Sequence, residues 1–339
     1  MCTFPIKEQK TPKVWFPTIK TGTGTEKFTI RLVELLNKRG IRAEITWLPL
    51  KAEYLPHLYK KIKAPSWANL IHINSWMPNK FSEYDLPIVT TIHSSAHDPK
   101  LDQYKDILKK IYHDYYIRKI EITNIKKSKF VFCVSNHVKN IALENLYNMD
   151  YKVIYNGVNT KIFHPIDKKN KKNQEIRLLY AGAWKSMKGI NSLPKIINEL
   201  GENFYLSYTG PSKNDATTLK MPKNTQNLGF LKHEDVIKNL QNSDALILLS
   251  KTEGLPLIAL EAMSCGIPVI GSSIEPLKEI ISIDNGYLSN NENEIISFLK
   301  SEHKNLENLG KQARKKIINE FNIDKMVDNY IYYYFEALK

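Results

Sequence analysis

The spacing of apolar and polar positions at the start of the chain predicts a β-α-β unit. Residues 14–17 form a short apolar run of strand length, and the glycine-containing turn TGTGTE follows it. Four apolar residues then recur at helical spacing within residues 27–39: Phe28, Leu32, Leu35 and Leu36. Gly40 stands where helices commonly end, and the next run, IRAEITWL, is typical of a strand.

The same alternation of strand-length and helix-length patterns continues along the chain. The apolar runs typical of strands are residues 69–74, 87–93, 130–135, 176–182, 204–210, 244–250 and 268–273. Strands that alternate with helices predict parallel sheets with right-handed crossovers. Residues 166–175, IDKKNKKNQE, are polar without an apolar period and indicate a domain boundary.

This pattern predicts an α/β protein with two Rossmann-like, doubly wound parallel-sheet domains that face each other across a cleft. The N-terminal domain would span residues 1–165 and the C-terminal domain residues 166–320. Residues 321–339 are expected to form a helix that is able to pack back toward the first domain. Open α/β sheets bind ligands at the carboxyl ends of their strands, so we expect the site there.

The composition argues against a disordered, disulfide-rich or membrane-spanning protein. The 339 residues are 42% hydrophobic and 25% charged, as in ordinary globular domains. The three cysteines lie far apart without a C-x-x-C pair, which favours neither disulfides nor a thiolate zinc site. The first residues lack the apolar core of a signal peptide, and no apolar run approaches about 18 residues. We therefore expect a cytoplasmic location.

The formal charge of +14 is concentrated in the first half of the chain. Residues 1–165 hold 26 Lys and Arg against 14 Asp and Glu, a net +12, and the remaining residues hold 23 against 21, a net +2. A first half this basic attracts anionic lipid, nucleic acid or a phosphorylated acceptor. Lysine together with many asparagines can also reflect a bias in nucleotide composition.

The segment SDALILLSKTEGLPLIALEAMSCGIPVI, residues 243–270, carries the most informative pattern. A buried strand and a short loop precede Pro256, which stands where the first turn of a helix accepts proline. The first amides of that helix have no partners within it and attract a diphosphate. Glu253 precedes the helix, and Glu261 follows Leu257 by one turn. Carboxylates accept hydrogen bonds from O–H groups, so the pattern indicates that they hold sugar hydroxyls beside a diphosphate.

Around these two glutamates the chain resembles glycosyltransferase family 4, the retaining group 1 enzymes with the GT-B fold. The E-x-x-x-x-x-x-x-E motif of the family is matched by Glu253 and Glu261, and EGLPLIALEAMSCGIPVI fits the surrounding pattern. Further segments are similar to family segments in the same order: TGTGTEKFTIRLVELLNKRG, TTIHSS, VSNHVKNIALENL through KVIYNGVNTKIFHP, LLYAGAWKSMKGI and NLGFLKHEDVIKNLQNSDALILLS. The similarity extends from about residue 14 to residue 335.

The resemblance implies a role for each matched residue. Glu253 would bind hydroxyls of the donor sugar, Lys188 would neutralise the leaving diphosphate, and His93 would lie near the transferred sugar, so these three would be catalytic. The implied donor-binding residues are Gly24, Gly182, Lys185, Phe230, Leu231, Gly254, Leu255, Leu257 and Glu261. Among them, Glu261 would bind the ribose hydroxyls, and Gly24 would let its loop approach the diphosphate closely. The resemblance implies neither a metal nor a cofactor.

One position departs from the family pattern. The family usually has a phosphate-binding arginine five residues before the lysine that Lys188 matches, and that position is Ala183 here. Lys185 or Lys213 could supply the charge, although a lysine lacks the bidentate fork of arginine.

Some of these features have simpler interpretations. The TGTGT loop has two of the three glycines of a nicotinamide-binding motif, so it is either a turn that packs a helix on a sheet or a loop that binds the donor phosphates. His93, His97 and Asp98 have a ligand-like spacing, but they follow a strand, which disfavours a metal site. The chain has no D-x-D motif, which disfavours a metal-dependent GT-A enzyme.

The function implied by the resemblance is retaining, metal-independent transfer of a sugar from a nucleotide diphosphate, with UDP favoured. The acceptor would be a saccharide or a lipid-linked saccharide in the synthesis of a cell-surface polysaccharide or lipopolysaccharide. Another GT-B enzyme, such as a nucleotide-sugar epimerase, is the first alternative. An inactive scaffold, suggested by Ala183, and a basic nucleic-acid-binding protein are alternatives of another class. No nucleic-acid motif accompanies the charge, so we do not expect nucleic acid as a partner.

Residues 100–129 form a basic segment with nine Lys and Arg and four Asp and Glu. Apolar and tyrosine side chains recur in it at near-helical spacing: Leu101, Tyr104, Leu108, Ile111, Tyr112 and Tyr115. Such a helix either packs its apolar stripe on the sheet of the first domain or rests on an anionic membrane surface. The second interpretation would make the protein peripheral on the inner face of the cell membrane.

Overall fold

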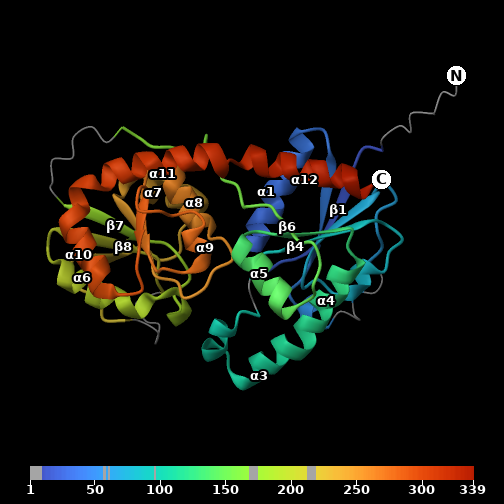
Figure 1. Ribbon diagram of the computed structural model, residues 1–339, viewed down its shortest axis with the longest axis horizontal. Helices are drawn as coiled ribbons and strands as arrows, with labels where there is room; N and C mark the ends of the chain where they lie inside the picture. Colours follow the sequence, from blue (N-terminus) through green and yellow to red (C-terminus); the bar gives the residue numbers. More distant parts are fainter. Residues whose placement is uncertain (1–9, 56–58, 60–61, 95–96, 168–174, 212–218) are drawn as a thin grey trace. The chain divides into compact units, whose positions relative to one another are not determined.

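The computed structural model describes residues 10–55, 59, 62–94, 97–167, 175–211 and 219–339. The chain divides into two compact units, which can be followed by colour in Figure 1. The first unit consists of Met1–Tyr155 with Lys325–Lys339, and the second of Asn156–Asp324. The division therefore falls before the polar stretch at residues 166–175, and most of the last helix of the chain belongs to the first unit.

The first unit is built on a six-stranded parallel sheet with the order β2-β1-β3-β4-β5-β6. Its strands are β1 (Lys13–Ile19), β2 (Arg42–Leu48), β3 (Leu70–Asn74), β4 (Ile88–Ile92), β5 (Phe130–Cys133) and β6 (Lys152–Val153). Central strands β3 and β4 are buried along their whole length, as expected of strands covered on both faces.

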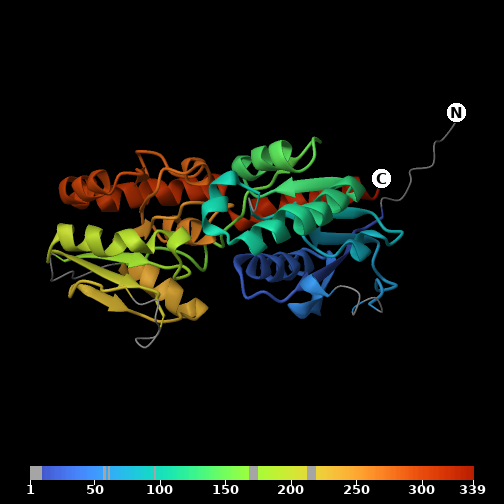
Figure 2. The same ribbon diagram turned by 90° about the horizontal axis from the view of Figure 1, so that it is seen from below.

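The helices of the first unit lie on both faces of this sheet. They are α1 (Gly24–Lys38), α2 (Lys51–Tyr54), η2 (Asn79–Ser82), η3 (Pro99–Tyr104), α3 (Ile107–Ile111), η4 (Tyr112–Ile117), α4 (Arg118–Lys127), α5 (Asn136–Asn145) and α12 (Ile323–Ala337). The chain runs from β1 outward to β2 and then crosses to β3 on the other side of β1. Because crossovers are right-handed, this reversal puts α1 and α4 on opposite faces, as Figure 2 shows.

The second unit repeats this plan with a six-stranded parallel sheet of order β12-β11-β10-β7-β8-β9. Its strands are β7 (Ile176–Tyr180), β8 (Phe204–Tyr208), β9 (Thr225–Asn227), β10 (Ala245–Leu248), β11 (Val269–Gly271) and β12 (Gly286–Leu288). Its helices are η5 (Ser186–Lys188), η6 (Ile190–Ser192), α6 (Leu193–Leu200), α7 (His233–Asn242), α8 (Leu257–Ser264), α9 (Glu275–Lys278), α10 (Glu292–Glu302), η7 (His303–Asn305) and α11 (Leu306–Glu320). The strand order reverses between β7 and β10, so the loops that follow these two strands are the expected ligand-binding loops.

A buried polar network attaches α12 to the sheet of the first unit. The Nδ1 atom of His72, on β3, lies 2.6 Å from the hydroxyl oxygen of Tyr334, and its Nε2 atom lies 2.7 Å from Oγ1 of Thr91 on β4. Tyr330 and Tyr334 are completely buried, so these tyrosines of the last helix belong to the core. Burial, and secondarily the proximity of His93, lower the pKa of His72 to about 3, which keeps its imidazole neutral.

The architecture confirms the predicted α/β fold with two parallel-sheet units. Of the four apolar positions predicted for the first helix, Phe28, Leu32 and Leu36 are buried on α1, whereas Leu35 is only partly buried. Among the residues that the structure describes, no helix is both long enough and apolar enough to cross a membrane.

Candidate functional site

The loops after β7 and β10 are bound to each other at the point where the strand order of the second unit reverses. The amide of Lys251 donates a hydrogen bond of 2.9 Å to the carbonyl oxygen of Met187. Gly189 has a φ of +76°, and a Cβ atom at this position would lie 2.1 Å from the carbonyl oxygen of Leu249. Only glycine fits such a position, so the chain itself requires it where the two loops meet.

Two of the predicted catalytic side chains meet in this pair of loops. The Nζ atom of Lys188, at the end of η5, lies 2.5 Å from Oε1 of Glu253. The hydroxyl of Ser250, which follows β10, donates a hydrogen bond of 2.7 Å to the same carboxylate oxygen. The Lys188 and Glu253 side chains are 24% and 13% exposed, so the ion pair is partly shielded from water. Ser250 was not among the residues predicted from the sequence.

Helix α8 begins directly after the loop that carries Glu253. Pro256 precedes it with an extended backbone, φ −72° and ψ 115°, and Leu257 is its first residue. The first amides of a helix lack partners within it, so this end of α8 can receive an anion. Gly254 and Leu257 are partly exposed in this loop and first turn, and Leu255 is buried.

The second predicted glutamate and an unpredicted asparagine flank this helix start. Glu261, one turn into α8, is buried with 7% of its surface exposed. The side-chain amide of Asn156 donates a hydrogen bond of 3.1 Å to the carbonyl oxygen of Leu255 and so ties the loop to the first residue of the second unit. At the neighbouring Gly157 a Cβ atom would lie 2.5 Å from Cα of Ile323, so the close approach of this backbone requires glycine.

The loop after β7, which carries Gly182 and Lys185, is closed by contacts with Thr209, the residue that follows β8. The Gly182 amide donates 2.9 Å to Oγ1 of Thr209, and that hydroxyl donates 2.8 Å back to the Gly182 carbonyl oxygen. The Tyr180 hydroxyl donates 2.9 Å to the carbonyl oxygen of Ala183, the position where the family has arginine. Ala183 and Lys185 are exposed, whereas Lys213 lies outside the described residues. Whether Lys185 supplies the missing charge stays a prediction.

Phe230 and Leu231 follow β9, which is two strands away from β7 at the edge of the sheet. Phe230 is 94% exposed and Leu231 is partly exposed. Gly229 precedes them with a φ of +65°, and its amide donates 2.8 Å to Oδ1 of Asn227. Their role at the donor stays a prediction.

In the first unit, the predicted residues Gly24 and His93 are both linked to α1. Gly24 is the first residue of α1, and a Cβ atom added there would meet nothing within 4 Å. The preceding loop is closed by Glu26, whose Oε2 atom accepts hydrogen bonds of 2.8 Å from the amides of Thr21 and Gly22. The chain itself therefore does not demand a glycine at position 24.

His93 follows β4, and its ring centre lies 4.5 Å from that of Phe28 on α1. Its Nε2 atom is buried and has no hydrogen-bond partner among the described residues. Burial lowers the pKa of His93 to about 3, so the imidazole is neutral at ordinary pH. The unsatisfied Nε2 atom of this neutral ring can accept a hydrogen bond from a ligand group or donate one to it, depending on the tautomer.

The neighbouring residues His97 and Asp98 have other partners than His93. Nε2 of His97 lies 2.5 Å from Oε2 of Glu121, and the Ser75 hydroxyl donates 2.5 Å to the other oxygen of that carboxylate. Asp98 accepts from the amide of Lys100 at 2.9 Å. Within the described part of the chain, no group of three or more His, Cys, Asp or Glu could hold a metal ion.

Two parallel α/β units and a lysine–glutamate pair at the start of a helix define a protein of the GT-B type. Residues 163–316 match the family model described as glycosyl transferases group 1, and residues 42–162 match the model of glycosyltransferase family 4. The chain belongs to group 1 of glycosyltransferase family 4, which confirms the family predicted from the sequence.

Curated relatives carry glycosyltransferase names. An uncharacterized glycosyltransferase of Methanocaldococcus jannaschii is 31% identical over 72% of this chain and 67% of its own. N-acetyl-alpha-D-glucosaminyl L-malate synthase of Bacillus anthracis is 26% identical over 80% and 75%. UDP-Gal:alpha-D-GlcNAc-diphosphoundecaprenol alpha-1,3-galactosyltransferase of Escherichia coli is 30% identical over 62% and 60%.

Solved structures share the fold. Sucrose-phosphate synthase of Thermosynechococcus elongatus superimposes with a TM-score of 0.79, at 17% identity, over 96% of this chain and 98% of its own. HepE of Anabaena, solved with UDP-glucose, has a TM-score of 0.72 at 14% identity over 96% and 99%. At these identities the likeness establishes the fold alone.

Proposed function

We propose that the chain transfers a sugar, with retention and without a metal ion, from a UDP-sugar to a saccharide or lipid-linked acceptor in the synthesis of a cell-surface polysaccharide or lipopolysaccharide. The observation that carries this proposal is the contact of Lys188 with Glu253 beside the first turn of α8. A cation, a carboxylate and an open helix end are the groups needed to hold a sugar diphosphate and to release the diphosphate.

The charges of these groups fit the demands of the reaction. When the bond between sugar and diphosphate breaks, negative charge develops on the leaving oxygen, and the Lys188 ammonium together with the first amides of α8 would stabilise it. The Glu253 carboxylate is an acceptor and would bind hydroxyls of the donor sugar. Ser250 and Lys188 both bind one oxygen of this carboxylate, so its orientation is set before the donor arrives.

Independence from a metal ion is proposed because Lys188 and the end of α8 offer the positive charge that a divalent cation supplies in other sites. Retention is proposed from membership of family 4, whose usual mechanism is attack on the face from which the diphosphate leaves. We keep a cytoplasmic location as a prediction.

The donor base is proposed from related proteins. The relative in E. coli is named for UDP-galactose, and HepE of Anabaena was solved with UDP-glucose. We therefore propose uridine, without choosing the sugar.

The acceptor is proposed on similar grounds. The name of the E. coli relative specifies a diphosphoundecaprenol-linked sugar, whereas that of the B. anthracis relative specifies malate, a small soluble acceptor. A lipid-linked saccharide is our preferred acceptor, and a soluble acceptor is the alternative outcome.

The test is a donor panel followed by product analysis. UDP- and GDP-sugars are first compared for the rise in melting temperature that binding to the native state produces. The best donor is then incubated in excess EDTA with a diphosphoundecaprenol-linked sugar or a free saccharide, and the linkage formed is determined by NMR. An α-linked product from an α-linked donor supports the proposal. Inversion, abolition by EDTA with rescue by magnesium, or a changed nucleotide sugar without transfer would contradict it.

A further inference from the structure

One face of helix α3 carries large apolar side chains that are exposed to solvent. No residue of α3 is buried, and Ile107, Leu108 and Ile111 are 79%, 81% and 51% exposed. Tyr115, one turn further along the same helical run, is 77% exposed. Positions i, i+1, i+4 and i+8 of a helix fall within an arc of roughly 100°, so these four side chains share one surface, which we call the α3 face. Single exposed apolar residues are common, but four on one helical face mark an interaction site.

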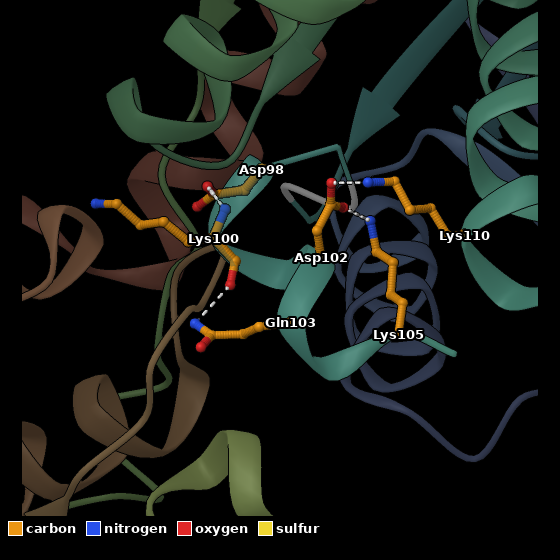
Figure 3. A network of polar contacts seen from close by, with 6 residues as sticks. All are labelled: Asp98, Lys100, Asp102, Gln103, Lys105 and Lys110. Carbon is orange, nitrogen blue, oxygen red and sulfur yellow. Dashed lines mark hydrogen bonds and ion pairs between the residues drawn. The ribbon is translucent and has the colours of Figure 1, made fainter. Parts of the chain in front are cut away.

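The base of α3 is held by polar contacts, which Figure 3 shows from close by. One carboxylate oxygen of Asp102, on η3, lies 3.1 Å from Nζ of Lys105, and the other lies 2.7 Å from Nζ of Lys110. The side chain of Asp106 accepts 2.7 Å from the amide of Lys109 and caps the helix. Hydrogen bonds from Lys110 and Lys105 hold the pKa of Asp102 below its usual value, so this carboxylate is charged near neutral pH and attracts both ammonium groups.

A second set of contacts joins the helical run to α2. The hydroxyl of Tyr112 donates 3.0 Å to Oε1 of Glu53, and that of Tyr116 lies 3.4 Å from the Glu53 carbonyl oxygen. The ring of Tyr54 lies 5.5 Å from that of Tyr112 and is itself 56% exposed. These contacts fix one side of the helical run, while none of the residues that the structure describes buries its apolar face. The interpretation that this stripe packs on the sheet is wrong for Leu108, Ile111 and Tyr115.

Exposed cations lie on the helical run that carries the α3 face. Lys109, Arg118 and Lys119 are exposed on the same helical run. Lys105 is different, because its side chain is only 6% exposed and is paired with Asp102. Residues 100–129 carry nine basic and four acidic residues, and the first half of the chain carries almost all of the net positive charge.

We propose that the α3 face, formed by Ile107, Leu108, Ile111 and Tyr115, is a docking surface for an anionic lipid bilayer, with Arg118 and Lys119 on the lipid phosphates. Such a bilayer matches both halves of this surface. Its acyl boundary covers isoleucine and leucine, tyrosine is favoured at the level of the headgroups, and long cationic side chains reach the phosphates from the rim. An acidic groove on a partner protein would also attract these cations. A bilayer explains in addition why the apolar side chains lie on the outer surface of a helix.

Docking does not depend on the proposed transfer reaction, so the two can fail separately. Binding is measured by sedimentation with vesicles of phosphatidylcholine alone and with vesicles that also contain phosphatidylglycerol, because an anionic surface attracts each nearby cation by about 1 kcal/mol. We expect the protein to bind the anionic vesicles at low salt, to bind the neutral ones at least about tenfold more weakly, and to dissociate as salt rises.

Two sets of variants separate charge from apolar contact. The double variant Arg118→Gln and Lys119→Gln should weaken the partition into anionic vesicles by up to about 30-fold. The double variant Leu108→Ser and Ile111→Ser should weaken it by about tenfold or more without changing the salt dependence. Both sets lie on the exposed surface, so the melting temperature should be unchanged.

Matched controls come from the second unit. Lys300 and Lys304 are exposed, and their change to glutamine removes the same net charge. Ile283 and Ile318 are 69% and 45% exposed, and their change to serine removes similar apolar surface. Neither control should alter vesicle binding by more than about twofold, since these residues lie outside the α3 face.

Three outcomes would overturn the proposal. The first is equal binding to both kinds of vesicle, or none at low salt. The second is an equal loss in the control variants, which would mean that net charge alone acts. The third is a dimer in solution that dissociates on Leu108→Ser, because this would assign the α3 face to a second copy of the chain. Transfer to a water-soluble acceptor should be unaffected by all α3 variants, and its absence from the wild type would count against the proposed function instead.

Discussion

Replacing His72 with a side chain that cannot titrate should make the free energy of unfolding of the first unit less dependent on pH in the acidic range. In the folded chain burial holds the pKa of His72 at about 3, whereas the ordinary value is 6.5. Between these values the unfolded chain binds a proton that the folded chain does not, so the stabilisation is complete above about pH 6.5 and falls as the pH decreases. His72→Gln keeps a polar side chain but cannot titrate.

The size of the effect follows from the window that the two pKa values define. Well below pH 6.5 each pH unit costs about 1.36 kcal/mol, and summed over the titration the wild type should lose about 2.7 kcal/mol at this site between about pH 7.5 and 4.5. Any native pKa below about 4 gives nearly the same loss over that interval. At pH 7.5 the variant should be less stable by about 1–3 kcal/mol, because the contacts with Tyr334 and Thr91 are weakened. This difference should vanish or reverse at pH 4.5.

The measurement is urea unfolding followed by tryptophan fluorescence. Four of the five tryptophans lie in the first unit, which makes the signal report mainly on that unit: Trp15, Trp47, Trp67 and Trp76. His164→Gln, at an exposed position of the second unit, is the control and should track the wild type at both pH values. A difference between wild type and His72→Gln that stays constant, or grows, from pH 7.5 to 4.5 would refute a neutral buried His72.

The remaining predictions concern the donor. Lys188→Ala should cost about 2–4 kcal/mol of transition-state stabilisation, measured from kcat/KM. The double variant with Glu253→Gln should cost less than the sum of the two single changes, because Lys188→Ala alone leaves the carboxylate without its ammonium partner. Strict additivity of the two changes would argue that the pair does not persist at the donor. Glu253→Ala should lower kcat, whereas Glu261→Ala, on the buried side of α8, should mainly raise the donor KM; wild-type kinetics in both would show that the site is elsewhere. Ala183→Arg should tighten donor binding by about tenfold if no lysine replaces the usual arginine, and Lys185→Gln should weaken it by a similar factor if Lys185 does; titration calorimetry decides between them.

The sequence predicted the fold well because parallel α/β units have a strong periodic signal. Buried strands such as those that became β3 and β10 appear as short continuous apolar runs, and the helices between them have apolar stripes. The end of the first unit was less visible. The division at Tyr155 and Asn156 depends on long-range packing, whereas the polar stretch at residues 166–175 was the only local signal.

At the candidate site, the local pattern indicated Glu253 and Glu261, and the resemblance indicated Lys188. The contact of Lys188 with Glu253 joins two loops whose strands, β7 and β10, are neighbours in the sheet but not in the sequence. Ser250 and Asn156 were missed because their residue types are common at strand ends and turns, and only the tertiary contact gives them a role. The exposed α3 face was left open for a related reason, since periodicity shows that a helix has an apolar side but not what covers it.

Two glycines, the predicted Gly24 and the unpredicted Gly189, differ in what requires them. At Gly189 the chain itself forbids a side chain, because a Cβ atom would lie 2.1 Å from the carbonyl oxygen of Leu249 and φ is +76°. At Gly24 a Cβ atom would meet nothing within 4 Å, and the backbone is that of an ordinary first helical residue. The fold therefore does not by itself explain the glycine at position 24. The first turn of α1, with its amides unpaired within the helix, is where an anion would approach closely. A donor-phosphate role for the loop before α1 stays a prediction.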